Sequence, residues 1–90
     1  MAYLEVRTKK GTKKLRLDGR TTTIGRHPDS NLVITDDRSS REHCVIEPVP
    51  EGYRVRDLGS RNGTRLNEKK IDVEILDHND VIRIGKTILR

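Results

Sequence analysis

The chain of 90 residues carries a formal net charge of +5 at pH 7, and 37% of its residues are charged whereas only 2% are aromatic. This length accommodates a single domain, over residues 1–90, and the basic balance favours an acidic partner, such as nucleic acid, an anionic surface or a phosphorylated protein. The sequence has no apolar run long enough to span a membrane, no hydrophobic segment after Met1 and one cysteine, Cys44, so we expect a cytoplasmic protein with no internal disulfide.

The N-terminal segment predicts a β-hairpin. Residues 3–7 alternate, with Leu4 and Val6 on one face, and Leu15 and Leu17 repeat this period of two after a polar turn. Lysines cluster around the tip of the hairpin: Lys9, Lys10, Lys13 and Lys14. We expect them to form a solvated face that protects the edge of a sheet, although they could also touch an acidic partner.

The middle of the chain predicts short strands separated by polar loops. The β-branched and apolar stretches predict strands at residues 21–24, 32–34, 43–47 and 53–57. The segments between them consist of turn-forming or charged residues, so we expect loops at residues 25–31 and 35–42 and a turn at residues 48–52.

The C-terminal part continues the same pattern. Residues 64–66 predict a strand, Asn67 and Glu68 a hairpin connection, and residues 77–80 a turn. Two last strands are expected at residues 81–84 and 87–89. No stretch shows sustained helical periodicity, so the fold class we expect is all-β, an antiparallel sandwich of two sheets with ligand-binding loops at one end.

The strongest local signal is the stretch from Asp57 to Thr64. Asn62 is followed by glycine, a frequent turn signal, and glycines can take positive φ without steric cost. We expect a rigid loop that presents the hydroxyl, guanidinium and amide of Ser60, Arg61 and Asn62 at the rim of a sheet, where they can recognise a small anion. An ordinary hairpin connection accounts for the same residues without any binding function.

Catalytic and metal-binding patterns fail on spacing. Residues 85–87 end like a phosphate-binding P-loop, but Asp80 stands where that motif needs a glycine. The three histidines lack the spacing of a metal site, and Ser40 with His43 has no recognisable oxyanion hole or third orienting group. We therefore expect a protein that is not an enzyme and needs no metal or cofactor.

Three polar loops, each at the end of a predicted strand, carry short motifs in a specific order: Gly25-Arg26, Ser40-x-x-His43 and Asn62-Gly63-Thr64. In this order and at about these separations, they resemble the signature of the forkhead-associated (FHA) domain family. The resemblance extends from about residue 22 to residue 88. It implies a β-sandwich that binds phosphothreonine peptides through loops at one end.

Carried over by position, the resemblance implies three phosphate-binding residues: Arg26, Ser40 and Arg41. Arg61 is a fourth candidate because its guanidinium suits a phosphate. The resemblance implies that Asn62 binds the peptide backbone and that Arg38 reads the side chain three residues after the phosphothreonine. It also implies four residues that shape the loops: Gly25, His43, Gly63 and Thr64. Many family members have Thr or Ser where Arg61 stands, so Arg61 either contacts the phosphate or points to solvent. Arg38 in turn either meets the ligand or only offsets Asp36 and Asp37.

The expected function is non-catalytic recognition of phosphothreonine in Ser/Thr kinase signalling, by a monomer that binds neither membranes nor nucleic acid. A phosphothreonine carries about −1.5 to −2 charge and three acceptor oxygens, which suits convergent arginine and serine donors. A basic nucleic-acid-binding β-domain is the alternative, but with only Tyr3 and Tyr53 the chain lacks an aromatic stacking platform. A third reading is an interaction fold whose phosphate site has lapsed, and the presence of Arg26, Ser40 and Asn62 argues against it.

Overall fold

A computed structural model describes residues 2–8 and 10–90, so that Lys9 of the predicted basic cluster lies outside the described part. All regular structure in these residues is β-strand, and none of them forms a helix that could cross a membrane. The strands are β1 (Ala2–Thr8), β2 (Gly11–Leu17), β3 (Thr22–Gly25), β4 (Leu32–Val33), β5 (Cys44–Val49), β6 (Gly52–Asp57), β7 (Thr64–Leu66), β8 (Lys69–Ile71), β9 (Val73–Ile75), β10 (Ile82–Ile84) and β11 (Thr87–Leu89).

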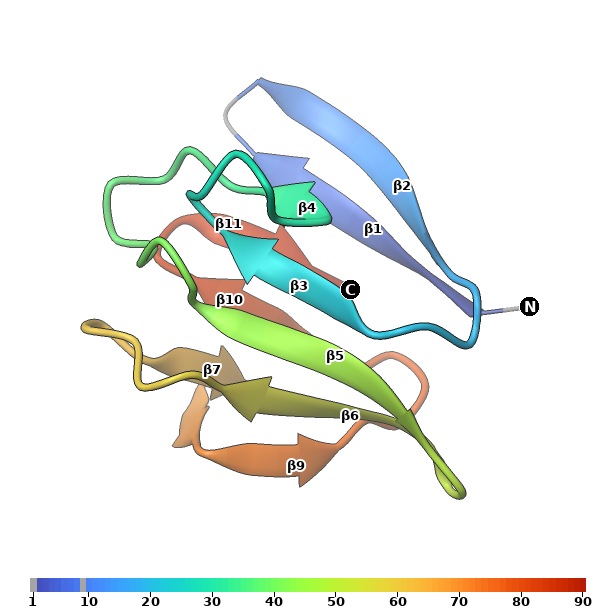
Figure 1. Ribbon diagram of the computed structural model, residues 1–90. Coiled ribbons are helices and arrows are strands. Elements are labelled where there is room, and N and C mark those ends of the chain that lie inside the picture. The colour runs from blue at the N-terminus through green and yellow to red at the C-terminus, as the bar shows by residue number, and fades with distance from the viewer. Residues whose placement is uncertain (1, 9) are drawn as a thin grey trace.

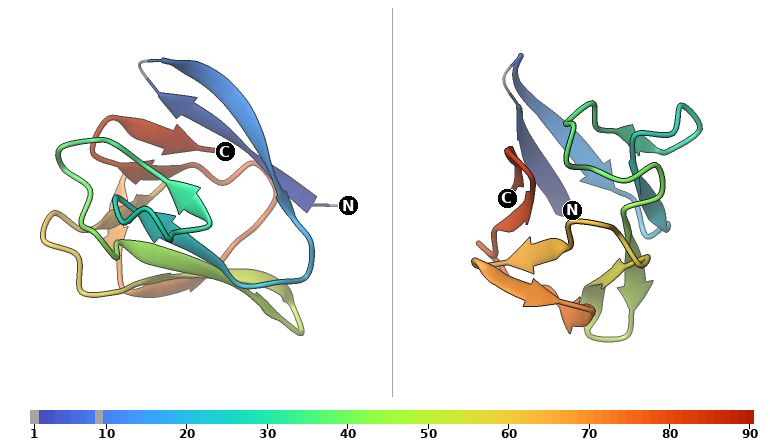
Figure 2. Two further views of the ribbon diagram at one scale, coloured as in Figure 1. Left: turned by 45° about the horizontal axis from the view of Figure 1, so that its top comes forward. Right: turned by 90° about the vertical axis from the view of Figure 1, so that its left-hand side faces the viewer.

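The strands form two sheets that face each other (Figures 1 and 2). One sheet has six strands in the order β2-β1-β11-β10-β7-β8, and the other has five in the order β4-β3-β5-β6-β9. The strand pairs are antiparallel except for β3 with β4, which run parallel. The predicted antiparallel β-sandwich is thus confirmed.

Aliphatic side chains from alternate strand positions fill the space between the sheets. Leu4 and Val6 of β1 face this core, as their period of two predicts, with 7% and 1% of their surface exposed. The other core residues are Leu17, Ile24, Leu32, Ile34, Cys44, Ile46, Val55, Leu66, Ile71, Ile82, Ile84 and Leu89. Burial raises the pKa of the Cys44 thiol to about 12, so this cysteine is a small core residue rather than a reactive nucleophile.

Two features of the five-stranded sheet differ from the sequence-based expectation. The turn expected at residues 48–52 is shorter, because β5 continues through Val49 and Pro48 pairs with Tyr53. Strand β9 was not predicted, because its three residues are too short a stretch to show a recognisable alternation. It forms because its backbone completes the edge of the sheet beside β6.

The hairpin connection at Asn67 and Glu68 is confirmed, with φ angles of 52° and 71°. Positive φ at both central residues matches the twist of the flanking strands. The basic cluster also lies where a solvated edge was expected, since Lys10, Lys13 and Lys14 are exposed at the tip and along β2, the edge strand of the six-stranded sheet. Charged side chains on an edge strand discourage pairing with other chains.

The loops gather at the two ends of the sandwich. Figure 1 shows the connections β3–β4, β4–β5, β6–β7 and β10–β11 at its left-hand end. The β2–β3 connection and the β5–β6 turn lie at the opposite end. The three motif-bearing loops therefore share one end, although their sequences are separated by whole strands.

Candidate functional site

Backbone hydrogen bonds join the first two motif-bearing loops. The N–H of Arg26 donates to the carbonyl oxygen of Ser40 at 3.0 Å, and the N–H of His27 donates to that of Arg41 at 3.1 Å. These bonds continue the pairing of β3 with β5 beyond the ends of the strands. Arg26 is thereby placed directly beside Ser40.

Gly25 allows this close approach. The glycine is buried, and a Cβ atom at this position would overlap the carbonyl oxygen of Arg41. Because the obstacle is backbone rather than the end of a flexible side chain, any larger residue would push the two loops apart.

His43 connects the second loop to the third from beneath. Its side chain is fully buried, its Nδ1 accepts a hydrogen bond from the N–H of Ser40 at 3.0 Å, and its Nε2 lies 2.9 Å from the carbonyl oxygen of Gly63. Nδ1 is the acceptor, so Nε2 carries the proton and donates to Gly63. Burial lowers the pKa of His43, and it outweighs the opposing effects of the Gly63 bond and of the carboxylates of Asp57 and Asp36. The imidazole therefore works as a neutral cross-link.

Asp57 organises the third loop. Its Oδ1 accepts hydrogen bonds from the hydroxyls of Ser60 at 2.5 Å and Thr64 at 2.7 Å, and its Oδ2 accepts from the N–H groups of Gly59 and Ser60, both at 3.0 Å. Burial raises the pKa of Asp57, but the bonds from Ser60 and Thr64 outweigh it and hold the pKa below its usual range. Sequence reasoning placed Asp57 at the start of this loop without giving it a role. The signal was the Asp-x-x-Ser spacing, typical of a carboxylate that caps its own turn.

The Ser40 hydroxyl lies between the second and third loops. Its Oγ accepts a hydrogen bond from the N–H of Arg61 at 3.0 Å, and the residue is partly exposed. A hydroxyl that accepts one bond can still donate its own proton, so Ser40 keeps a donor for a ligand.

The exposed Asn62 side chain is tied to the second loop by its Nδ2, which donates to the carbonyl oxygen of Arg38 at 2.9 Å. The amide oxygen and the second amide proton of Asn62 are not used in this bond.

The four arginines at this end, Arg26, Arg38, Arg41 and Arg61, are exposed. Within residues 2–8 and 10–90, none of them forms an ion pair with a carboxylate. A guanidinium is permanently charged and presents a planar fork of donors that fits carboxylate or phosphate oxygens. The arrangement can hold a compact anion beside Ser40.

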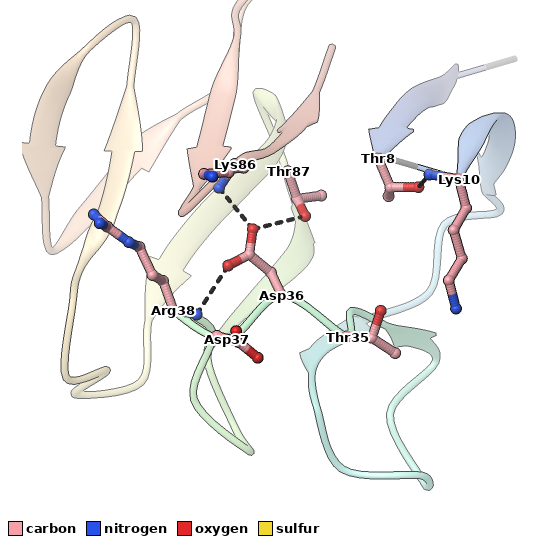
Figure 3. Close-up of a pocket in the computed structure, with 8 residues that line it drawn as sticks. All are labelled: Thr8, Lys10, Thr35, Asp36, Asp37, Arg38, Lys86 and Thr87. Atoms are coloured by element: carbon pink, nitrogen blue, oxygen red, sulfur yellow. Dashed lines mark hydrogen bonds between the residues drawn. The ribbon is translucent and has the colours of Figure 1, made fainter.

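A fourth segment, the β10–β11 turn, joins the same end through Asp36. The sequence analysis rejected residues 85–87 as a P-loop and gave them no other role. The carboxylate of Asp36 accepts hydrogen bonds from the N–H of Arg38 at 2.8 Å, the N–H of Lys86 at 2.6 Å and the hydroxyl of Thr87 at 3.4 Å (Figure 3). Burial raises the pKa of Asp36, but these bonds outweigh it and lower the pKa. The β10–β11 turn is thus attached to the loop that carries Arg38.

Comparisons with known proteins identify the family. A family model described as "FHA domain" matches residues 22–85. The "Oxoglutarate dehydrogenase inhibitor" of Corynebacterium jeikeium is 41% identical over 70 residues, which make up 78% of this chain and 49% of that protein. The chain spans about half the length of the curated relatives it matches.

Two solved structures have the same fold over almost the whole chain. The FHA domain of FhaA, complexed with the intracellular domain of Rv3910, superposes with a TM-score of 0.87 at 29% identity. The match covers 97% of this chain and 94% of the FhaA chain. A structure from a study of phosphothreonine-dependent FHA domain interactions gives a TM-score of 0.80 at 28% identity, with coverage of 98% and 93%.

Proposed function

This chain belongs to the FHA-domain family, and from that premise we propose that it is a non-catalytic module that binds phosphothreonine peptides in Ser/Thr kinase signalling. The observation that carries the proposal is the position of Arg26. Its backbone is bonded to Ser40 while its guanidinium is exposed and forms no ion pair within the described residues. A phosphate beside Ser40 would meet a charged fork and a hydroxyl donor together.

The geometry of the loops supports the following proposed roles. Arg26 and the hydroxyl of Ser40 bind the phosphate oxygens, and Arg41 and Arg61 add positive charge from the flanking loops. The N–H of Arg61 orients the Ser40 hydroxyl. Arg61 therefore has a role through its backbone, whatever its side chain contacts. Asn62 has amide capacity left for a peptide backbone beyond its bond to Arg38.

The residues that shape the loops hold these donors in place. Gly25 allows the first two loops to meet, His43 and Gly63 connect the second loop to the third, and Thr64 donates to the carboxylate of Asp57. Donors that are already ordered lose little conformational freedom when a ligand binds.

The alternative of a nucleic-acid-binding β-domain receives no support from the aromatic residues. The hydroxyl of Tyr53 donates to the carbonyl oxygen of Leu17 at 2.6 Å and accepts from the N–H of Gly19 at 2.8 Å, so this ring has a structural role. Tyr3 is exposed but lies beneath the ammonium group of Lys14, 4.7 Å from the ring centroid. A stacking platform needs several free aromatic faces.

Residues 1–90 are further proposed to act as one monomeric domain in the cytoplasm. In support of a single domain, strands from the two ends of the chain share a sheet, with Val6 of β1 paired with Leu89 of β11.

Binding is expected to depend on threonine phosphorylation, because the site offers donors for an anion and little apolar surface for an unmodified peptide. The best peptide from a phosphothreonine library should be compared with its unphosphorylated form by isothermal titration, with single-stranded nucleic acid as a third ligand. Equal affinity for the two peptides, or tighter binding of the nucleic acid, would contradict the proposed function.

Arg38 is expected to favour Asp or Glu three residues after the phosphothreonine. Its side chain is exposed in the loop that leads to Ser40, and such ion pairs are worth about 0 to 1 kcal/mol. The preference should thus be less than about tenfold and should shrink as salt rises. Peptides with Asp or Ala at this position should be titrated against the native protein and Arg38→Glu. A preference for Asp that survives the charge reversal would show that Arg38 is not the selector.

A further inference from the structure

We propose that a groove between the β1–β2 hairpin and strand β4 continues the peptide site, and that it binds acidic residues of the ligand beyond the third residue after the phosphothreonine. This inference rests on the proposed function and adds the class of sequence that the ligand carries.

The groove consists of two adjoining hollows of about 280 Å³ and about 340 Å³. They share three lining residues, Thr8, Lys10 and Thr35. The first hollow, drawn in Figure 3, extends to Arg38 and the β10–β11 turn, and the second extends along β4 to Val33 and along β2 to Lys13. Because β2 and β4 are the edge strands of the two sheets, the groove follows an open side of the sandwich.

The charge of the groove favours an acidic occupant. Its lining includes four cationic residues, Lys10, Lys13, Arg38 and Lys86, and two carboxylates, Asp36 and Asp37. The Asp36 carboxylate is already satisfied by three hydrogen bonds from Arg38, Lys86 and Thr87, and it faces those groups. Both carboxylates keep their negative charge, but the four cations outnumber them, and Asp37 is the carboxylate left without these bonds, so the lining is positive on balance.

The remaining lining suits an extended peptide. The hydroxyl of Thr35 can bond to a peptide group, whereas that of Thr8 is already bonded to Gly11 and Lys10 within the hairpin. The exposed side chain of Val33 can contact the stems of acidic side chains. Lys10 and Arg38 lie on opposite sides of the first hollow in Figure 3, so an acidic segment would pass between positive groups.

The groove begins where the proposed peptide site ends. Arg38 lines the first hollow and is two residues from Ser40, so their Cα atoms are at most about 7 Å apart, which two or three residues of extended peptide span. Asn62 holds the carbonyl oxygen of Arg38, and Asp36 holds its N–H. If the phosphate lies at Ser40 and the third residue after the phosphothreonine lies at Arg38, then the fourth residue after the phosphothreonine is the first to enter the groove.

The test compares four phosphothreonine peptides by titration at low salt. One ends at the third residue after the phosphothreonine, one continues with four Glu residues, one continues with four Gln residues, and one carries the four Glu residues before the phosphothreonine instead. The C-terminal Glu extension is expected to bind about tenfold tighter than the short peptide, because two or three exposed ion pairs, each adding only about two- to fivefold, together give about this factor. The Gln extension and the N-terminal Glu segment should give no such gain.

A matched pair of variants locates the effect. Lys10→Glu with Lys13→Glu reverses two charges that line the groove and should abolish the gain while leaving the affinity for the short peptide unchanged. Lys14→Glu with Arg16→Glu makes the same change in net charge on the same hairpin, at positions that do not line either hollow, and should keep the gain.

The outcomes separate the inference from the function on which it rests. The inference is overturned if the acidic extension gives no gain, if the gain survives in the Lys10/Lys13 variant, if the Lys14/Arg16 variant loses it equally, or if the N-terminal Glu segment gives the same gain. If the short phosphopeptide does not bind the native protein at all, the proposed function itself is wrong, and the inference is overturned with it.

Discussion

Replacement of Arg26 with alanine is expected to nearly abolish phosphothreonine binding while the domain remains folded. The Arg26 side chain is exposed and forms no ion pair within the described residues, so its removal should leave the core and the backbone bond to Ser40 intact. A charge-assisted contact to phosphate is worth about 1.5 to 3 kcal/mol, or roughly one to two decades of affinity. Titration with the best phosphopeptide measures the loss, and thermal unfolding measures the fold.

Three further variants sharpen the Arg26 test. Arg26→Lys keeps the charge but loses the planar fork, so it should bind between the native protein and Arg26→Ala. Ser40→Ala removes one neutral donor and should cost less than Arg26→Ala. Arg20→Ala, another exposed arginine, in the β2–β3 connection at the opposite end, should bind normally. Normal binding by Arg26→Ala, or its unfolding, would show that Arg26 does not have the proposed role.

Replacement of His43 with alanine should destabilise the domain by about 2 to 4 kcal/mol. The variant loses a fully buried side chain and leaves the N–H of Ser40 and the carbonyl oxygen of Gly63 without their partner. For a domain of this size, the melting temperature should fall by roughly 10 to 25 °C. Binding should weaken as well, because the second and third loops lose their cross-link. An unchanged melting temperature with lost binding would instead make His43 a ligand contact.

The pH dependence of stability provides an independent check on His43. Its pKa is lowered in the folded state, so the unfolded chain binds more protons as the pH falls below the ordinary value of 6.5. The native protein should therefore keep its full stability above about pH 6.5 and lose part of it as the pH falls through the window below. Urea unfolding between about pH 5 and pH 6.5, above the range in which the carboxylates of Asp36 and Asp57 titrate, measures the slope. The slope should disappear in His43→Ala and persist in His78→Ala, where the histidine is exposed. An equal slope in the native protein and His43→Ala would exclude this account.

The sequence alone was sufficient for most of the strands and for the fold class. Strands such as Thr87–Leu89 and the turn at Asn67 and Glu68 were predicted at the observed positions. These features depend on local physics, because a period of two marks one buried face and turn residues mark where the chain reverses. The same reasoning failed at β9, whose three exposed residues form a strand only because β6 offers an edge to pair with.

The order of the three short motifs also allowed the sequence to identify the family, since their spacing can be read along the chain. How the motif-bearing loops are held together was decided only by the tertiary structure. The sequence from Asp57 to Thr64 fits an ordinary hairpin connection equally well, whereas residues 58–63 cross from β6 in one sheet to β7 in the other. A crossing of this kind depends on which strands pair at long range, and local residue patterns do not encode that choice.

The hydrogen-bond partners of Asp36 are the clearest example of contacts that the sequence alone does not predict. Its carboxylate binds the backbone of Lys86, a residue 50 positions further along the chain, and so attaches the β10–β11 turn to the loop that carries Arg38. In the sequence, Asp36 looked only like a neighbour that Arg38 could neutralise, and residues 85–87 looked like a failed P-loop. A carboxylate accepts a hydrogen bond from any donor that the fold brings within reach, so its partner is known only after both sheets have formed.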